Sequence, residues 1–346
     1  MLETLVITNA LSGGGAERSM NQLCNQFLEL DMDVELLAIE SGPLDQQAFS
    51  GKVSSLHRNK GILGTTKALF KFIRLVRNKP TRVALLNCEL PELFGLFLPL
   101  KTRLIVIQHN PKPWSRAISL GKIVRRLLRI RSAIFISVSD HMKIWPTYTS
   151  PAAVIPNPLT LGYLPIEQKT RTIQTLIYIG RLVDHQKNPQ QVIRIAERVG
   201  LPVKFIGSGN FKSELESLGH LHGVDVEFSG YRTHPWQLFG SGEILIVPSL
   251  EEGDGLVVLE ACARGIPILM SDIPDFRRFD FDSKHYCAED LDYIQSISSK
   301  LDDINYFIID SKDALRIVNE RTIGMIGDMW KELIERLGDQ NHEKGC

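Results

Sequence analysis

Short apolar runs of strand length alternate along this chain with longer segments in which apolar residues recur at helical spacing. Continuous apolar runs are typical of strands in a parallel sheet, because helices bury both of its faces. The pattern stops in the polar stretch 157–172 and starts again near residue 173. The chain therefore predicts an α/β fold with two doubly wound Rossmann-like domains, which hold ligand in a cleft at the carboxyl ends of their strands. Strands are expected at 4–9, 34–39, 82–87, 103–108, 133–138, 152–156, 175–180, 202–207, 225–229, 243–248 and 266–270.

The restart of the pattern divides the chain into three predicted parts. Residues 1–160 are expected to form an N-terminal Rossmann-like domain, and residues 173–312 a C-terminal one. The last helical pattern, in 313–346, lacks a following strand, and we expect it to pack back on the N-terminal domain. A length of 346 residues is that of two ordinary domains.

The charges are distributed unevenly, although the net charge is zero. Residues 1–160 contain 20 Lys/Arg and 11 Asp/Glu, a net charge of +9, and the remainder carries −9. Between residues 46 and 139 the acids are Glu89 and Glu92, against 18 basic residues. Such a basic half indicates an anionic partner, which is phosphate, nucleic acid or an acidic membrane surface. Aromatic residues are not interleaved with the basic ones as stacking surfaces require, which argues against nucleic acid.

Two basic amphipathic stretches lie in this half, at 67–77 and 120–131. In the second, a helix would place residues 120, 123, 124, 127 and 128 on one apolar face. Its opposite face would carry Lys122, Arg125, Arg126 and Arg129. This pattern is typical of a helix that lies in an anionic membrane interface. It also fits an ordinary surface helix whose apolar face packs on the sheet. The shortage of acids favours membrane contact.

A glycine turn between two glutamates follows the predicted strand 243–248. Glu252 and Glu260 are separated by seven residues, and Gly253 and Gly255 lie between them. Glycines let a ligand approach the backbone, and the N-terminus of the following helix offers N–H groups to an anion. The segment therefore predicts a site for a phosphorylated, hydroxyl-rich ligand such as a nucleotide sugar.

Two cations follow the predicted strand 175–180, where ligand is expected. Arg181 offers a fork of donors and Lys187 a point charge, so together they could neutralise a diphosphate. The alternative is that both are solvated surface charges.

Two further segments of the N-terminal half are candidates for ligand contact. Gly13, Gly14 and Gly15 form a strand-to-helix turn that could wrap phosphate, or could be only a tight turn. The dinucleotide fingerprint would need a glycine at Arg18, which argues against a nicotinamide enzyme. His109 ends a predicted strand and could act as a base or contact a reacting sugar, although a lone histidine is more often structural.

Several classes of protein lack support in the sequence. Five scattered cysteines without a CxxC pair suggest neither a disulfide framework nor a zinc site, and a reducing cytoplasm is expected. No signal peptide and no apolar run of about 18 residues is apparent. Asp-x-Asp pairs occur, but none follows a strand end in a glycine-rich context, so no metal site is expected. Phosphate-loop and hydrolase-elbow motifs are also missing.

In order and spacing, these motifs resemble the family 4 glycosyltransferases, which are retaining enzymes with two Rossmann-like domains, the GT-B architecture. The resemblance covers roughly residues 4–275. It is carried by residues 13–18, 108–110, 138–139, 154–158, 180–188, 206–209, 228–231 and 248–261.

The resemblance implies a role for each site residue. The N-terminal domain would bind the acceptor, and the C-terminal domain the nucleotide-sugar donor. Arg181 and Lys187 would grip the donor diphosphate, Glu252 the sugar hydroxyls and Glu260 the ribose. His109 would lie near the transferred sugar. The remaining donor contacts would come from Gly13, Gly14, Gly15, Gly180, Gly207, Gly255, Leu256 and Val257.

One residue departs from the family pattern. Asp254 stands where the family usually has an aromatic or apolar residue. A carboxylate near a diphosphate is unfavourable unless it turns away or binds a sugar hydroxyl.

The predicted function is therefore that of a retaining hexosyltransferase that needs no metal or other cofactor. It would move a sugar from a UDP- or GDP-sugar to a glycan or lipid-linked acceptor in bacterial surface polysaccharide biosynthesis (lipopolysaccharide, O-antigen or capsule). The expected location is the cytoplasm, peripheral on the inner face of the membrane. The alternatives are a nucleotide-sugar epimerase of the same fold and a non-catalytic nucleotide-sugar binding protein.

Overall fold

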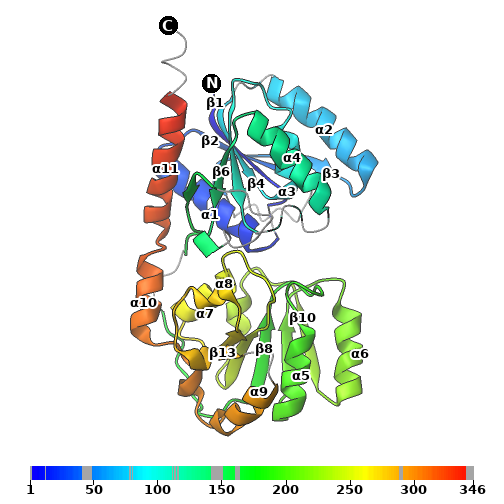
Figure 1. Ribbon diagram of the computed structural model, residues 1–346, viewed down its shortest axis with the longest axis vertical. Helices are drawn as coiled ribbons and strands as arrows, with labels where there is room; N and C mark the ends of the chain where they lie inside the picture. The colour runs from blue at the N-terminus through cyan, green and yellow to red at the C-terminus, as the bar shows by residue number, and fades with distance from the viewer. Residues whose placement is uncertain are drawn as a thin grey trace. The chain divides into compact units, whose positions relative to one another are not determined.

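The computed structural model describes residues 2–11, 13–40, 49–77, 79, 81–110, 112, 114, 117–141, 151–159, 164–287 and 291–339. The chain divides into two compact units. Unit 1 comprises Met1–Thr160 and Arg321–Cys346, and unit 2 comprises Leu161–Glu320. Each unit is a parallel sheet with helices on both faces (Figure 1). The prediction of two doubly wound α/β sheets is thereby confirmed.

Unit 1 contains a seven-stranded parallel sheet in the order β3-β2-β1-β4-β5-β6-β7. The order reverses at β1, which pairs with β2 on one side and β4 on the other. Such a reversal is the topological switch point at which open α/β sheets bind ligand. The strands are β1 (Leu2–Thr8), β2 (Val34–Glu40), β3 (Lys52–Arg58), β4 (Thr81–Asn87), β5 (Arg103–Gln108), β6 (Ile134–Ser137) and β7 (Ala153–Val154).

Helices cover both faces of this sheet because alternate residues of each apolar strand point to opposite sides. In β1, Val6 joins a core with α1 (Gly15–Glu29) and α11 (Ile323–Asp339). Leu5 and Ile7 join the opposite core, which includes residues of the other three helices of the unit. These are α2 (Ile62–Arg77), α3 (Glu89–Gly95) and α4 (Ile118–Ile130).

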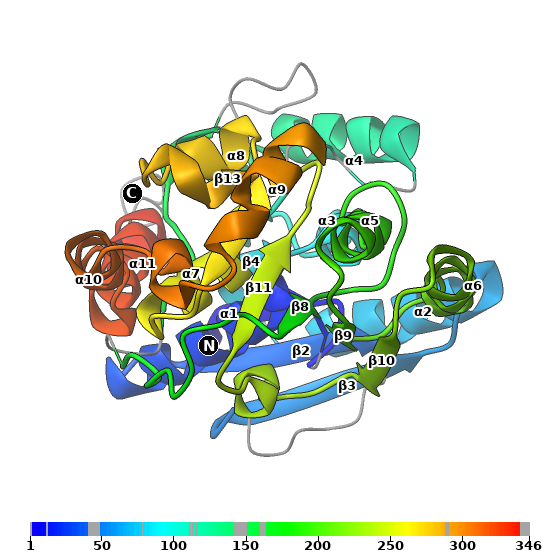
Figure 2. The same cartoon turned by 90° about the horizontal axis from the view of Figure 1, so that it is seen from below.

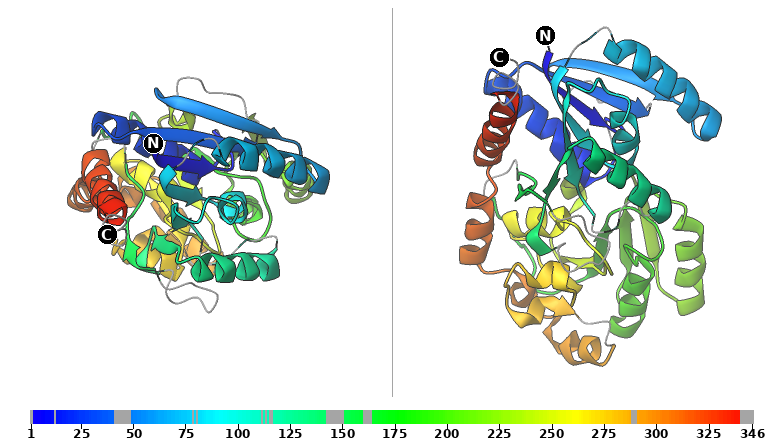
Figure 3. Two further views of the ribbon diagram at one scale, coloured as in Figure 1. Left: turned by 90° about the horizontal axis from the view of Figure 1, so that it is seen from above. Right: turned by 45° about the horizontal axis from the view of Figure 1, so that its top comes forward.

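The last helix of the chain, α11, completes the first of these two cores. Ile326, Trp330 and Ile334 are buried in the cluster that also contains Phe27 of α1. Figure 3 shows α11 alongside α1. Unit 1 is thus built from two segments of the chain that are distant in sequence.

Unit 2 contains a six-stranded parallel sheet in the order β10-β9-β8-β11-β12-β13. Figure 2 shows α5 and α7 on opposite sides of its strands. The strands are β8 (Thr175–Ile179), β9 (Val203–Ile206), β10 (Val226–Gly230), β11 (Glu243–Val247), β12 (Ile268–Ser271) and β13 (Tyr286–Cys287). The helices are α5 (Gln190–Val199), α6 (Lys212–His222), α7 (Leu256–Ala263), α8 (Pro274–Arg277), α9 (Leu291–Ile297) and α10 (Ser311–Asn319).

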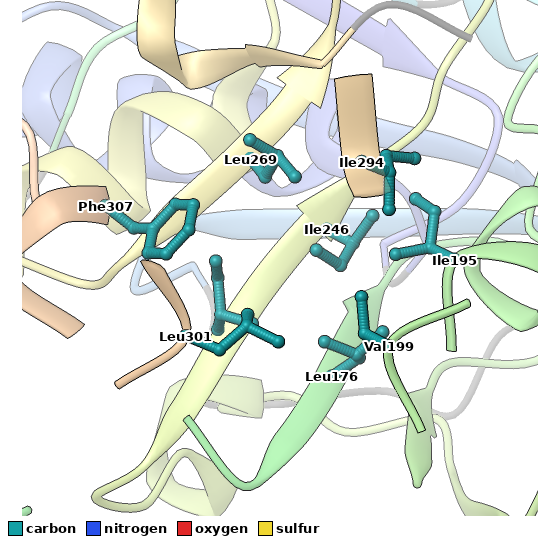
Figure 4. A pocket seen from close by; sticks show the side chains of 9 residues that line it. Leu176, Ile195, Val199, Ile246, Leu269, Ile294, Leu301 and Phe307 are labelled. Atoms are coloured by element: carbon teal, nitrogen blue, oxygen red, sulfur yellow. The ribbon is translucent and has the colours of Figure 1, made fainter. Parts of the chain in front are cut away.

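A small cavity lies in the core of unit 2, between the sheet, α5 and α9 (Figure 4). Every side chain that lines it is apolar, including Leu176, Ile246 and Phe307. An apolar void of this kind offers no polar group to orient a ligand, so we regard it as a packing defect of the core.

The structure differs from the predicted elements at the edges of the sheets and at the end of the chain. Strand β3 was not predicted, because its sequence is polar and all but one of its residues are exposed or half-buried at the edge of the sheet. Strand β13, at the edge of the second sheet, was not predicted either. The helical pattern predicted as one helix from residue 313 onward is two helices. The first, α10, belongs to unit 2 and the second, α11, to unit 1.

Over the described ranges, no helix combines the length and the apolar character needed to cross a bilayer.

Candidate active site

In unit 2, the loops after β8 and β11 meet at the carboxyl ends of these adjacent strands. Lys187 of the first loop forms an ion pair with Glu252 of the second, through the Nζ and Oε1 atoms. The backbone N–H of Leu250 donates to the Gln186 carbonyl oxygen at 3.0 Å, which fastens one loop to the other. The structure thus brings together two residues that the sequence predicted for one site.

The Glu252 carboxylate and backbone are held by two buried neighbours. The Ser249 hydroxyl donates to Glu252 Oε1 at 2.9 Å, and the Glu252 N–H donates to Asp275 Oδ2 at 2.9 Å. Burial, together with the charge of Glu252, raises the pKa of Asp275 to about 6, although the Glu252 N–H lowers it. Sequence reasoning missed both neighbours. Their signal was that Ser249 follows β11 and Asp275 follows β12, at the same edge of the sheet.

Arg181 lies in the same loop as Lys187 and is exposed to solvent. Its guanidinium donates to the Gln186 side chain at 3.3 Å. Its carbonyl oxygen accepts the Tyr178 hydroxyl at 2.8 Å, and burial raises the pKa of that hydroxyl. The backbone at Arg181 is therefore fixed while its cationic side chain extends into solvent.

Two glycines at this edge are required by the backbone. A Cβ on Gly207, which has φ of +154°, would lie 1.8 Å from the Gly180 carbonyl oxygen. Gly255 adopts a left-handed φ of 63° as the residue that caps α7. These positions favour glycine because other residues would clash or be strained.

The turn at Gly255 leads into the N-terminus of α7. Leu256 is the first residue of this helix and Val257 the second. The N–H groups of a first helical turn have no carbonyl partner within the helix, and the helix dipole favours an anion beside them. The start of α7 can therefore bind a phosphate or a sugar oxygen.

Asp254 does not face this N-terminus with an uncompensated charge. Arg278, which follows α8, donates through Nη2 to the Asp254 carboxylate at 2.8 Å and to its carbonyl oxygen at 2.7 Å. Asp254 is buried in this ion pair. The carboxylate at a usually apolar position of the family is thus balanced by a cation from a later loop.

Glu260 lies on α7 and is held by Trp236. The indole Nε1 donates to Glu260 Oε2 at 2.6 Å. Glu260 is half-buried, whereas Trp236 is buried. Sequence reasoning did not identify Trp236, which lies between β10 and β11 without a motif of its own.

In unit 1, three residues line up across the carboxyl ends of β1, β4 and β5. His109 Nε2 is hydrogen-bonded to Asn87 Oδ1, and Asn87 Nδ2 donates to the Thr8 hydroxyl at 3.1 Å. Because the amide oxygen of Asn87 only accepts, Nε2 of His109 carries the proton in this arrangement. His109 is therefore oriented by the two strands next to its own.

In unit 1, the glycine turn at residues 13–15 is hydrogen-bonded to a carboxylate. Gly13 and Gly14 precede α1 and Gly15 begins it. The Gly14 N–H donates to Glu17 Oε2 at 3.0 Å, so Glu17 caps the helix. The Glu17 carboxylate would repel an anionic ligand that approaches the Gly14 N–H. Such a ligand would therefore bind more favourably at the other N–H groups of the turn.

Helix α4 departs from its predicted arrangement. Arg125 was expected on the outer basic face, but it is 6% exposed. Its guanidinium Nη2 lies 2.8 Å from Glu92 Oε1, within a buried ion pair. A charge can be buried when it is paired in this way, and Glu92 of α3 provides the partner. The prediction for Arg125 is therefore wrong.

The other basic residues of α4 are exposed, as are several of its apolar ones. Lys122, Arg126 and Arg129 face solvent. Leu120, Ile123 and Leu127, which belong to the predicted apolar face, are exposed too. Among the apolar positions of the predicted face, Val124 and Leu128 are buried. The outer side of α4 thus mixes cations with apolar side chains.

Within the part of the chain that the structure describes, no group of three or more His, Cys, Asp or Glu side chains is arranged to hold an ion.

Comparison with known proteins identifies similar chains. Residues 165–286 match the family model of glycosyl transferases group 1. An uncharacterised glycosyltransferase of Methanocaldococcus jannaschii is 33% identical over 106 residues, and the match covers 28% of this chain and 27% of that relative. An α-1,4-N-acetyl-D-galactosaminyltransferase of Campylobacter jejuni is 23% identical over 289 residues, which cover 75% of this chain and 77% of that protein.

The fold is likewise shared with solved structures. HepE of Anabaena in complex with UDP and glucose superposes with a TM-score of 0.76 at 15% identity, over 97% of this chain and 100% of that one. Two conclusions follow: residues 165–286 belong to the glycosyl transferases group 1 family, and the chain has the GT-B fold.

Proposed function

We propose that this protein transfers a sugar, with retention of anomeric configuration, from a nucleotide-sugar donor to a glycan or lipid-linked acceptor. The observation that carries the proposal is the cluster of Lys187, Glu252 and Ser249 at the carboxyl ends of β8 and β11. It combines a cation for a diphosphate with a fixed carboxylate for sugar hydroxyls, beside the N-terminus of α7. That HepE was solved with UDP and glucose supports the choice of donor class.

Each side chain of the site has a proposed role. Arg181 and Lys187 bind the donor diphosphate, and Glu252 accepts hydrogen bonds from the sugar. Glu260 accepts them from the ribose. The other donor contacts keep the roles that the family resemblance implies, and they are His109, the Gly13–Gly15 turn, Gly180, Gly207 and the backbone from Gly255 to Val257.

The proposed reaction is a front-face displacement. The bond between the anomeric carbon and the diphosphate oxygen breaks, and the acceptor hydroxyl forms its bond from the same side. The departing diphosphate takes the hydroxyl proton. Arg181, Lys187 and the N–H groups of α7 lower the barrier because they stabilise the charge that develops on this leaving group. We propose that these groups supply the positive charge without a metal ion.

The test is turnover by the Lys187→Ala variant. A panel of UDP- and GDP-sugars is first screened by thermal shift, since a bound donor stabilises the fold by mass action. Turnover of the best donor with an oligosaccharide acceptor should fall by roughly 10²-fold or more in the variant, the scale of losing one transition-state contact. Product NMR should show the donor's anomeric configuration.

Lys204→Ala is the matched control. Lys204 is as buried as Lys187 and is also paired with a carboxylate, Glu243, but it lies near the amino ends of the strands. It should retain turnover. Unchanged turnover in Lys187→Ala would defeat the catalytic role, and an inverted product would exclude the front-face reaction. Conversion of the donor without acceptor would favour an epimerase.

We further propose that the acceptor is reached at an anionic membrane surface, in bacterial surface polysaccharide biosynthesis. The name of the Campylobacter relative gives an acceptor linked to undecaprenol diphosphate, which is a lipid carrier. Helices α2 and α4 both pack inward on the same core of unit 1, so their outer sides lie over one face of the sheet. We call the exposed side chains of α2, α4 and the α3–β5 connection the outer helical face.

The outer helical face combines exposed apolar side chains with cations and no acids. Ile62 is 84% exposed, Phe70 76% and Leu100 89%. Apolar side chains of this exposure gain free energy when they enter a bilayer interface, and lysines beside them attract anionic lipid. Its apolar and basic residues are Ile62, Leu63, Lys67, Phe70, Lys71, Arg74, Arg77, Phe97, Leu100, Lys101, Ile118, Leu120, Lys122, Ile123, Arg126, Leu127, Arg129 and Ile130.

Cosedimentation with phosphatidylglycerol vesicles tests this surface. Wild type should bind at low salt and keep part of its binding at high salt, because apolar insertion is not screened. Leu63→Ser with Phe70→Ser should lose the salt-resistant part. Leu221→Ser, an equally exposed leucine on α6, should behave as wild type. Absence of vesicle binding at low salt would remove the membrane claim.

A further inference from the structure

Trp236 lies in a single 3-10 turn, Pro235–Leu238, between β10 and β11. Its indole N–H donates to one carboxylate oxygen of Glu260 at 2.6 Å. An indole nitrogen can only donate a hydrogen bond, so the Glu260 carboxylate is the acceptor in this contact. Trp236 is itself buried, which fixes the position of the donor.

Arg264, the residue that follows the end of α7, contacts both members of this pair. Its Nη1 donates to the backbone carbonyl oxygen of Glu260 at 2.9 Å. Its guanidinium carbon lies 4.9 Å from the centroid of the Trp236 ring, over the indole face. The tryptophan is thus held between Glu260 and Arg264, and a cation over its ring stabilises that stacked position.

The consequence for Glu260 is a fixed carboxylate. A glutamate on a helix surface samples several rotamers, and it loses that freedom whenever it binds a ligand. A carboxylate has about four lone-pair sites, so it can accept from Trp236 and from vicinal hydroxyls at the same time. Because the carboxylate is already oriented, less conformational entropy is lost on binding.

We propose that Trp236 is a positioning residue that holds Glu260 for the 2′- and 3′-hydroxyls of the donor ribose. It thereby makes the site selective for ribonucleotides over 2′-deoxyribonucleotides. This inference rests on the proposed function, which assigns the ribose to Glu260.

The experiment measures the binding of UDP and 2′-deoxy-UDP, and of GDP and 2′-deoxy-GDP, by isothermal titration calorimetry. Wild type should bind the ribose form of its preferred pair roughly tenfold more tightly or better, the scale of one hydrogen bond to a charged group. Trp236→Phe keeps the ring but removes the N–H, so the ribose-to-deoxyribose ratio should fall several-fold. Glu260→Ala should bring the ratio close to one.

Trp114→Phe is the control. Trp114 also donates its indole N–H to a buried glutamate, Glu92 at 2.9 Å, but in unit 1. The same substitution with the same lost bond should leave the ratio at the wild-type value.

The possible failures are distinguishable. If Trp236→Phe weakens both nucleotides equally, its role is only structural and the inference is overturned, while a collapse of the ratio in Glu260→Ala would still support the ribose contact. If Glu260→Ala leaves the ratio unchanged, the assignment of Glu260 to the ribose fails, and the positioning role fails with it. Binding of neither pair to wild type would overturn the proposed donor site and this inference together.

Discussion

At the carboxyl ends of the strands in unit 2, charged side chains form ion pairs. Lys187 is paired with Glu252, and Asp254 with Arg278. The sequence predicted the first two residues for one site, because each follows a strand at the same edge of a sheet. It could not predict Arg278 as the partner of Asp254, because that contact depends on how the chain turns after β12. An approaching diphosphate would compete with Glu252 for Lys187, so donor binding and rearrangement of this pair are coupled.

Asp275 yields a prediction about pH. Burial raises its pKa to about 6 from an ordinary 3.8. A carboxyl whose pKa is raised on folding contributes stability below its unfolded pKa, and this stability is lost as pH rises through the folded value. Between pH 4 and pH 6 the wild type should therefore lose stability that Asp275→Asn does not lose, on the order of 1–3 kcal/mol.

Urea unfolding across this pH range measures the difference. The exposed helix cap Asp310→Asn should follow the wild-type pH dependence, since its side chain caps α10 at the surface. If the free energy of unfolding of Asp275→Asn fell with pH as steeply as that of the wild type, the raised pKa of Asp275 would be contradicted.

At the level of elements, burial decided which predictions succeeded. Strands buried on both faces, such as β4 and β5, have continuous apolar runs and were predicted. Strand β3 at the sheet edge has no such run and was missed. Helix α4 was predicted, but its orientation was wrong at Arg125. The signal was Glu92, one of the two acids between residues 46 and 139, which can bury an arginine by pairing with it.

The junction of β8 and β9 gives a prediction at this level. Gly207 has no room for a Cβ, because the Gly180 carbonyl oxygen would lie 1.8 Å away. Gly207→Ala must displace the backbone before Arg181, so donor affinity should fall and stability should drop by roughly 1–3 kcal/mol or more. Thermal shift with and without donor measures both effects.

Gly200→Ala is the control, because it introduces backbone strain without a steric clash. Gly200 has a left-handed φ of 69°, but no atom lies within 4 Å of the position a Cβ would take. It should cost about 1 kcal/mol and leave donor affinity unchanged. If Gly207→Ala and Gly200→Ala changed stability and donor affinity equally, the close approach of Gly207 to the Gly180 carbonyl oxygen would be contradicted.

At the level of the molecule, the chain leaves unit 1 after residue 160 and returns to it at residue 321. From the sequence we expected the last helical pattern to pack back on the N-terminal domain, because it has no strand of its own. It did not predict that the pattern breaks into α10 and α11, since apolar periodicity continues through both helices.

Because α11 packs in the core of unit 1, we expect Trp330→Ala to destabilise that unit and not unit 2. Trp330 is buried among the residues of α1 and the sheet of unit 1. Removal of such a side chain should destabilise unit 1 by about 3–5 kcal/mol. Hydrogen exchange should therefore accelerate in β1 and β4 but not in β8 and β11. Met329→Ala, next to it but exposed, should change neither set, and equal acceleration in both units would refute the assignment.

The discontinuity of unit 1 also has a consequence for synthesis on the ribosome. Domains generally fold as the chain emerges, from the N-terminus onward. Here unit 2 is continuous and can fold as soon as it has been translated, whereas α1 lacks its α11 cover until the final segment appears. Through that interval the side of α1 that packs on α11 is open to chaperones, and unit 1 is completed only after unit 2.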